Sequence, residues 1–381
     1  EALVLNAGSN SITMTTAQHN AFTGGITAGG GTDQITLTTV DSINASSAVE
    51  QYNITATSTM TLGALAQNIE ELGAGDTTLV FGAGAYSGTF TNFEATDVLQ
   101  VVDGTDISGV TGLDVGVLDF QDGNATITLD AAQNGSMSIL NAGTGTQTIT
   151  LSSAGTPTGA VEVEAYILAD GDQTFTLGAA SQDVTSGTGA VVIDTGSIAD
   201  ITDAVFDGSK ATTSFAVNLA ADTDISGATI TGTNGNQDAD YEITLASNVD
   251  ATMTVAQNAR ITNADGANTV TLFNSGAATG FGGVEAYVLA DGDQTFTIGG
   301  GSQDVTTGSG NVVIDTGSTL TAYVATYNYF DNGLGWQYGA TSPEFASEAE
   351  ARQFVADEKQ APHHPNPVVL SVNQVQPTMD V

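Results

Sequence analysis

The chain has 381 residues, no cysteine and almost no basic side chains. Without cysteine it can form no disulfide framework, no thiol nucleophile and no cysteine-ligated zinc or iron–sulfur centre. It carries 4 Lys and Arg against 43 Asp and Glu, a formal net charge of −39, and its first basic residue is Lys210. Because so few cations cannot neutralise phosphates, we expect neither nucleic acid nor an anionic lipid surface as a partner.

Proline and long apolar runs are also scarce. Five of the six prolines lie from Pro343 onward, so the rest of the chain holds only Pro157. No apolar run approaches the ~18 residues that a membrane-spanning helix needs, so we expect no membrane insertion. An acidic excess of this size must be spread over the surface, bound to cations, or both. A calcium-rich exterior suits it better than cytosol, which predicts a secreted protein at the cell surface; a solvated acidic surface that only aids solubility is the alternative.

Internal duplication is the clearest positive feature. Residues 164–197 recur as 285–318 with 27 of 34 positions identical, and a weaker upstream copy begins with Val49, Glu50 and Tyr52. Other recurrences are an Ala-Gln pair after a strand (17–18, 132–133, 256–257) and Asp106–Gly109, which returns as Asp224–Gly227. Self-similarity at a fixed period indicates a repeat architecture. We therefore predict β units over 1–123 and 124–249, a partial unit over 250–318, and a different segment over 319–381.

The pattern inside each unit is strand and turn. Runs such as Ala125–Leu129 and Gln147–Leu151 alternate Thr with Ile or Leu, which is typical of half-buried strands. Gly, Asn and Asp separate such runs about every ten residues. The sequence predicts an all-β fold of repeated β-solenoid units, with tandem β-sandwiches as the alternative. Glycine-rich turns, little proline and few aromatic residues favour the solenoid.

The C-terminal segment has a composition of its own. Its aromatic residues are candidates for partner binding, or for the core of a cap: Tyr323, Tyr327, Tyr329, Phe330, Trp336 and Tyr338. Ser347 and Glu350 form a capping-box pattern that predicts a short helix to about Lys359. An extended, proline-punctuated tail follows, with 368–372 as its strand candidate. We interpret this segment as a cap over the last repeat or as an arm that docks on a neighbouring subunit.

Several segments resemble bacterial surface repeat proteins. They are Phe90–Glu94 before Asp97–Val102, Val163–Leu168 before an Asp-Gly-Asp turn, and the Ile-Thr-Leu strands that precede Ala-Gln. The style is similar to that of acidic, cysteine-free S-layer proteins and RTX-related adhesins exported by type I secretion, over roughly residues 1–318. The resemblance implies Ca²⁺-stabilised β units that assemble as coats, filaments or adhesive stalks. The tandem RTX nonapeptide is absent, and the Asp-Gly-Asp turns match only its Gly-x-Asp part.

Calcium is the ligand that the residues themselves favour. Ca²⁺ takes six to eight oxygen ligands, and an Asp-x-Asp turn places two carboxylates on one side of a tight loop. The candidates are Asp170 with Asp172, Asp291 with Asp293, Asp222 with Asp224, and Asp103 with Asp106, and a further pair is Asp238 with Asp240. The competing explanation is that Asp simply forms turns by bonding nearby backbone.

No motif of catalysis is present. The sequence has no Gly-x-Ser-x-Gly elbow, no His-Glu-x-x-His, no phosphate loop and no dinucleotide fingerprint, so we predict that the chain is not an enzyme. We predict a secreted structural protein that self-assembles on the bacterial surface as an S-layer, sheath or filament, with Ca²⁺ as cofactor. The alternatives are an adhesin or a phage fibre that binds a surface or a glycan such as cell-surface polysaccharide, and, least favoured, a β-helical polysaccharide-degrading enzyme.

Overall fold

The computed structural model describes residues 1–39, 42–55, 59–62, 66–73, 75–113, 116–121, 123–141, 144–233, 240–300, 303–316, 322–331, 335–341 and 368–375. The chain divides into two compact units, Glu1–Ile314 and Asp315–Val381. Each is described by itself.

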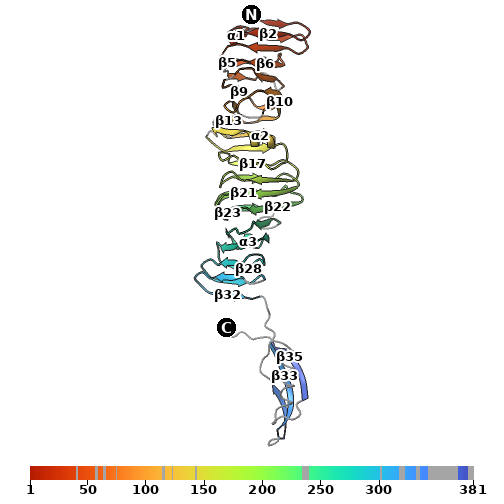
Figure 1. The fold of residues 1–381 in the computed structure, drawn as a ribbon, viewed down its shortest axis with the longest axis vertical. Coiled ribbons are helices and arrows are strands. Elements are labelled where there is room, and N and C mark those ends of the chain that lie inside the picture. Colours follow the sequence, from red (N-terminus) through yellow and green to blue (C-terminus); the bar gives the residue numbers. More distant parts are fainter. Residues whose placement is uncertain are drawn as a thin grey trace. The chain divides into compact units, whose positions relative to one another are not determined.

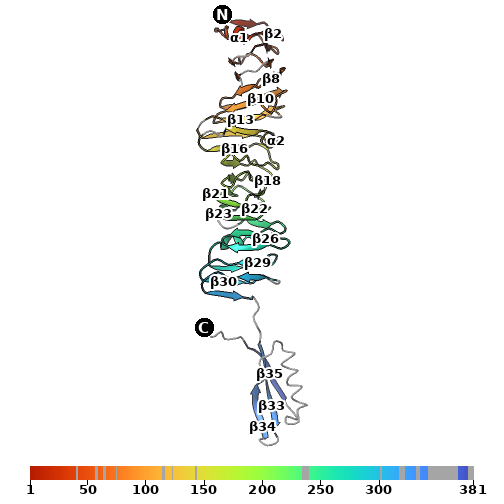
Figure 2. The ribbon, with the colours of Figure 1, turned by 60° about the vertical axis from the view of Figure 1, so that its left-hand side comes forward.

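The first unit is a parallel β-solenoid. Its strands alternate between two faces, and each strand pairs in parallel with strands one coil away (Figures 1 and 2). The first face is one sheet of 16 strands, in the order β2-β4-β6-β8-β10-β12-β14-β16-β17-β19-β21-β23-β25-β27-β29-β31. The predicted solenoid is confirmed, and tandem β-sandwiches are excluded for this unit.

The first-face strands are β2 (Ser11–Met14), β4 (Gln34–Leu37), β6 (Gln51–Ile54), β8 (Asn68–Glu71), β10 (Gly84–Thr91), β12 (Thr105–Thr111), β14 (Ala125–Leu129), β16 (Gln147–Leu151), β17 (Ala165–Ile167), β19 (Asp183–Thr185), β21 (Asp200–Asp207), β23 (Thr223–Thr231), β25 (Ala251–Met253), β27 (Thr269–Leu272), β29 (Ala286–Val288) and β31 (Asp304–Thr306).

The second face consists of four shorter parallel sheets. They are β1 (Leu3–Leu5) with β3 (Ile26–Ala28); β5 (Ser42–Asn44), β7 (Thr59–Thr61), β9 (Thr78–Val80), β11 (Val98–Val101), β13 (Val117–Phe120) and β15 (Ser138–Asn141); β18 (Gln173–Thr176), β20 (Ala190–Asp194), β22 (Ser214–Leu219), β24 (Glu242–Leu245) and β26 (Ile261–Ala264); and β28 (Ala277–Thr279), β30 (Gln294–Thr297) and β32 (Val312–Asp315).

Alternation along each strand builds the core between the two faces. In β14, Ala125, Ile127 and Leu129 are buried, while the threonines between them face outward. The register to β16 places Ile127 beside Ile149 and Leu129 beside Leu151, so like side chains stack coil on coil. Each coil therefore buries its apolar side chains against its neighbours, and stability comes from stacking.

Three short helices mark a repeat of six coils. They are α1 (Thr16–Asn20), α2 (Ala131–Ser136) and α3 (Val255–Asn258), each opened by a capping box whose N3 residue is the Gln of the recurring Ala-Gln pair. Six first-face strands, β2 to β12, precede the coil of α2, and six more, β14 to β23, precede the coil of α3. The second face is interrupted directly after each of these helix-bearing coils.

The capping glutamines of α2 and α3 tie their coil to the one before it. The amide Nε2 of Gln133 donates to the carbonyls of Ile107 (2.8 Å) and Val110 (3.1 Å), and that of Gln257 donates to Ile225 (2.9 Å) and Ala228 (3.3 Å). These carbonyls belong to irregular stretches of β12 and β23, which are the recurring Asp-Ile-Ser-Gly segments. The Ala-Gln pair and the Asp-Ile-Ser-Gly segment, which lie far apart in the sequence, are thus joined by hydrogen bonds.

The recurring Val-Glu-x-Tyr segment has a matching role. The Tyr52 hydroxyl oxygen accepts the backbone N–H of Ser46, six residues earlier, at 2.8 Å. In the same way, Tyr166 accepts the N–H of Ala160 and Tyr287 accepts that of Phe281. Burial raises the pKa of each of these three tyrosines to about 12. The carboxylate of Glu50 accepts the N–H of Asp33 in the preceding coil at 2.8 Å, and Glu164 and Glu285 make the equivalent bonds. The motif therefore closes one turn and caps the coil before it.

The second unit contains a three-stranded antiparallel sheet. Its order is β34-β33-β35, with β33 (Ala322–Asp331), β34 (Gly335–Thr341) and β35 (Val368–Val375). The strand expected at 368–372 is confirmed and is longer than predicted. The helix expected from Ser347 to Lys359 lies outside the described residues.

Candidate functional site

The Asp-Gly-Asp turns cap the turn of the next coil. Asp170 Oδ1 accepts the N–H of Thr188 and Asp172 Oδ1 accepts that of Ala190, both at 2.9 Å. The second copy repeats this, because Asp291 accepts from Ser309 (2.7 Å) and Asp293 accepts from Asn311 (3.1 Å). The backbone and side-chain bonds from Thr188 and Ser309 hold the pKa of Asp170 and Asp291 below the usual range. These carboxylates therefore have a structural task in the described fold.

The other two predicted pairs combine a cap with a local turn. Asp103 accepts the N–H of Thr126 and Asp222 accepts that of Asp250, so each again caps the next coil. Asp106 and Asp224 instead accept the N–H of the serine two residues later, inside the irregular strands β12 and β23. Asp238, of the further pair, lies outside the described residues.

All eight carboxylates thus use Oδ1 for a backbone N–H. Within the described residues, no group of three or more His, Asp or Glu side chains is arranged to hold a metal ion. Since Ca²⁺ needs several oxygens at once, its binding at these turns stays a prediction.

A buried pair of carboxyl groups was not foreseen from the sequence. Glu71, at the end of β8, and Asp97 are almost fully buried, and the backbone N–H and hydroxyl of Thr77 bond to Asp97 and Glu71 respectively. Burial, together with the nearby Asp97, raises the pKa of Glu71 to about 7. Glu71 ends a strand like many surface residues, so no local signal marks it; the burial comes from the coil stacked on it.

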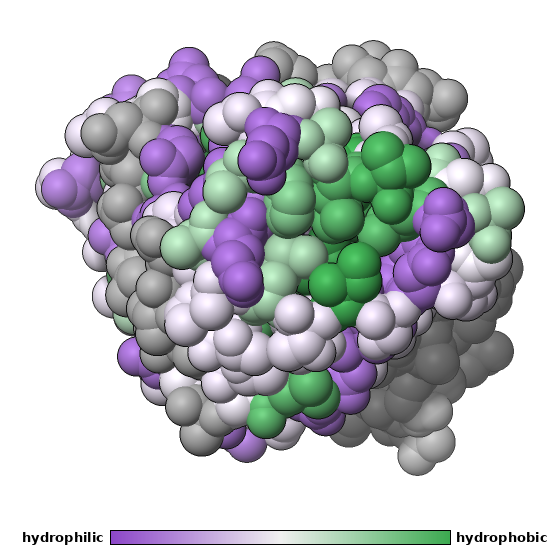
Figure 3. All heavy atoms as spheres, turned by 90° about the horizontal axis from the view of Figure 1, so that it is seen from above, coloured by the Kyte–Doolittle hydropathy of each residue, from purple (hydrophilic) through white to green (hydrophobic). Residues whose placement is uncertain are grey.

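In the first described coil, one side of the core has no described coil stacked on it. Among the described strands, β1 pairs only with β3 and β2 only with β4, so the outer edge of each has no partner among them. Figure 3 looks onto this end and shows hydrophobic residues gathered there beside hydrophilic ones. Leu3 and Ile12 pack against the core here but are only partly buried, and Val4, which faces outward from the same coil, is 67% exposed.

The six-coil repeat shows that the surface of this end corresponds to a surface that is buried in the later coils. By the positions of the capping glutamines, Ile12 corresponds to Ile127, which is fully buried beneath the preceding coil. Gln18 likewise corresponds to Gln133 and Gln257, whose side chains are 5% and 3% exposed, whereas Gln18 is exposed. The end therefore presents the surface that interior coils use to stack.

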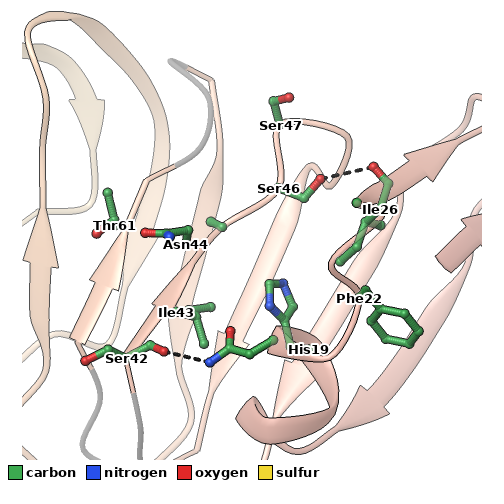
Figure 4. A pocket seen from close by; sticks show the side chains of 12 residues that line it. His19, Phe22, Ile26, Ser42, Ile43, Asn44, Ser46, Ser47 and Thr61 are labelled. Atoms are coloured by element: carbon green, nitrogen blue, oxygen red, sulfur yellow. Dashed lines mark hydrogen bonds between the residues drawn. The ribbon is translucent and has the colours of Figure 1, made fainter. Parts of the chain in front are cut away.

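A cleft opens where the second face is interrupted after α1. It lies between the facing edges of β3 and β5, has a volume of about 640 Å³, and is lined by His19, Phe22, Ile26, Asn44 and Ser46 among others (Figure 4). Two hydrogen bonds span it: Asn20 Nδ2 donates to the Ser42 carbonyl (3.0 Å), and Ser46 Oγ donates to the Ile26 carbonyl (3.3 Å). Its volume is that of a small-molecule site.

The aromatic residues proposed for partner binding lie on the sheet of the second unit. Tyr323, Tyr327, Tyr329 and Phe330 are on β33, and Trp336 and Tyr338 are on β34, with Phe330 directly opposite Trp336 in the register. The structure describes the backbone here and no side chain, so their role stays a prediction.

None of the described helices is long and apolar enough to cross a membrane. Comparisons with family models, with curated proteins and with solved structures found no match to this chain.

Proposed function

We propose that the chain is a secreted structural protein that self-assembles at a bacterial cell surface, as a coat, sheath or filament. The observation that carries this proposal is the surface of the first described coil, which is apolar in part and matches the surface through which interior coils stack. Its exposed apolar side chains and two strand edges without a described partner are suited to another β-rich surface, since such edges pair readily with further strands. A neighbouring copy supplies that surface in an assembly, and burial of apolar area favours the contact.

Charge opposes this association and suggests how it is controlled. With a net charge of −39, two copies repel each other, and cations must offset that repulsion at the contact. We propose Ca²⁺ in this role, with the turn carboxylates of Asp170, Asp172, Asp291 and Asp293 among its ligands. The absence of cysteine and the acidic surface also fit a calcium-rich exterior.

Sedimentation velocity on two matched variants tests the contact. Val4→Asp places a charge on the N-terminal end, whereas Val161→Asp places the same charge on an equally exposed valine away from that end, both side chains being 67% exposed. In millimolar Ca²⁺ we expect the parent and Val161→Asp to form large species and Val4→Asp to remain small. Equal association of both variants would show that the N-terminal end is not the contact, and a monomeric parent under all conditions would remove self-assembly.

A further inference from the structure

The helix beside the cleft after α1 differs from the helices of the other two repeats at two neighbouring residues, His19 and Asn20. By helix position, His19 corresponds to Asn134 and Asn258. Those asparagines donate through Nδ2 across the interruption, to the carbonyls of Thr158 (2.8 Å) and Thr279 (2.9 Å). In the first repeat the next residue, Asn20, bridges the interruption instead, but to the carbonyl of Ser42, two residues before the counterpart of Thr158 and Thr279. His19 is therefore released from the bridging task and faces the cleft, where Figure 4 shows its imidazole between Ile43 and the side of Phe22 and Ile26.

The hydrogen bonds around His19 determine which ring nitrogen carries the proton. Tyr52 Oη accepts the N–H of Ser46 at 2.8 Å and lies 3.1 Å from His19 Nε2. We assign the Tyr52 hydroxyl as the donor to His19 Nε2 by analogy with Tyr166, which donates to Asn134 Oδ1 in the second repeat (3.2 Å). A neutral imidazole that accepts at Nε2 carries its own proton at Nδ1.

Among the described residues, His19 Nδ1 has no hydrogen-bond partner. His19 is 6% exposed, and Nδ1 is buried without a hydrogen bond. Burial lowers the pKa of His19, which favours the neutral ring, and a smaller hydrogen-bond contribution from the Asn20 side chain opposes this shift. A buried donor left unpaired costs free energy, so an acceptor that enters the cleft gains a bond that the protein leaves open.

The rest of the cleft selects the kind of molecule that brings this acceptor. Asn44, Ser47 and Thr61 contribute amide and hydroxyl groups, and Phe22 contributes an aromatic ring. No cationic side chain lines the cleft, and the net charge of −39 disfavours anions. Hydroxyl-rich, uncharged molecules with apolar C–H faces match an aromatic ring beside several hydrogen-bonding groups.

We propose that this cleft binds one residue of a neutral saccharide, with a hydroxyl or acetamido oxygen accepting the His19 Nδ1–H. The site is present once, because the corresponding asparagines of the other two repeats are engaged in bridging. It goes beyond self-assembly and does not depend on it: it would give the assembled protein, or a single copy, one point of attachment to a surface glycan.

The test follows the histidine ring of the full chain by NMR after ¹⁵N-histidine labelling. Two probes, N-acetylglucosamine and glucose, are titrated to tens of millimolar. We expect at least one of them to shift the His19 Nδ1 and Nε2 resonances in a saturable way, with millimolar affinity. A response to N-acetylglucosamine alone identifies an acetamido acceptor, and a response to both identifies a hydroxyl.

His19→Asn is the matched variant, because it installs the residue that the other two repeats already carry and so should fold. Saccharide binding, followed through labelled Asn and Phe22 signals, should fall at least tenfold in this variant. If neither sugar perturbs His19, or if His19→Asn binds as well as the parent, the cleft holds only water and the proposal is wrong.

Discussion

The bond from Gln257 to the preceding coil gives the most quantitative prediction. Replacing Gln257 by Met keeps the length of the side chain but removes both polar groups. Oε1 no longer accepts the N–H of Thr254 (2.8 Å), and Nε2 no longer donates to Ile225 and Ala228. Orphaning a buried polar group costs roughly 1–3 kcal/mol, so the two carbonyls together account for about 3 kcal/mol. Burial of the more apolar methionine returns about 1 kcal/mol, which leaves about 2 kcal/mol.

Gln18→Met is the internal control, because it removes the same capping box without a preceding coil. Gln18 Oε1 accepts the N–H of Thr15 (2.9 Å), and the rest of its side chain is exposed. Both variants lose a cap worth ~1 kcal/mol, so they should differ by about 2 kcal/mol, the cost of the two carbonyls less the gain from burying methionine. This corresponds to roughly thirtyfold in the local opening equilibrium.

Hydrogen exchange followed by mass spectrometry measures that difference coil by coil. This matters because a stacked array need not unfold in one step. The measurement is made in chelator, so that the N-terminal end stays uncovered. Peptides spanning 223–264 should lose about thirtyfold more protection in Gln257→Met than peptides spanning 10–28 lose in Gln18→Met. Equal losses would refute the role assigned to the glutamine.

Four further substitutions, one of them a control, test other parts of the fold. Gly187→Ala should destabilise by at least about 2 kcal/mol in thermal denaturation, since its Cβ would lie 1.9 Å from the Ala169 carbonyl oxygen; Gly135→Ala, in α2 with open space around it, should be neutral or slightly stabilising. Glu71→Gln tests the buried carboxyl pair. The pKa of Glu71 in the folded protein is about 7, above the ordinary 4.5. Protonated Glu71 therefore contributes a stabilisation that is complete below pH 4.5 and is lost as pH rises through 7. The melting temperature of the parent should therefore fall as pH rises over that range, and that of the variant should not. The same pH profile in both proteins would contradict the raised pKa of Glu71. Asp170→Asn keeps an acceptor for Thr188 but removes a charge, so it should reduce any Ca²⁺-induced rise in melting temperature; an unchanged rise would remove this turn from the calcium ligands.

Local periodicity was enough to predict the strands and their stacking. The alternation in Ala125–Leu129 states which side chains face inward, and the glycine-rich turns favour coils over sandwiches. The Ala-Gln pair and the Asp-Ile-Ser-Gly segment were both visible as recurrences. Their connection was not, because Gln133 and Ile107 are 26 residues apart and meet only after the chain has turned through a full coil.

The candidate sites were predicted less completely for the same reason. The Asp-Gly-Asp turns were recognised as oxygen-rich, but their partners, the amide groups of Thr188 and Ala190, come from the next coil. Aligning the three helices would have singled out His19 as the residue that departs from asparagine. Its unpaired nitrogen depends on Tyr52, which lies 33 positions away and reaches it only through the fold.

Negative-stain electron microscopy of the purified chain tests self-assembly most directly. Specimens would be imaged in millimolar Ca²⁺, after chelation, and after Ca²⁺ is restored, with Val4→Asp alongside the parent. We predict ordered sheets or filaments of the parent that dissolve on chelation and form again with Ca²⁺, and none for Val4→Asp. Single, monodisperse particles of the parent in all three conditions would contradict the proposed structural role.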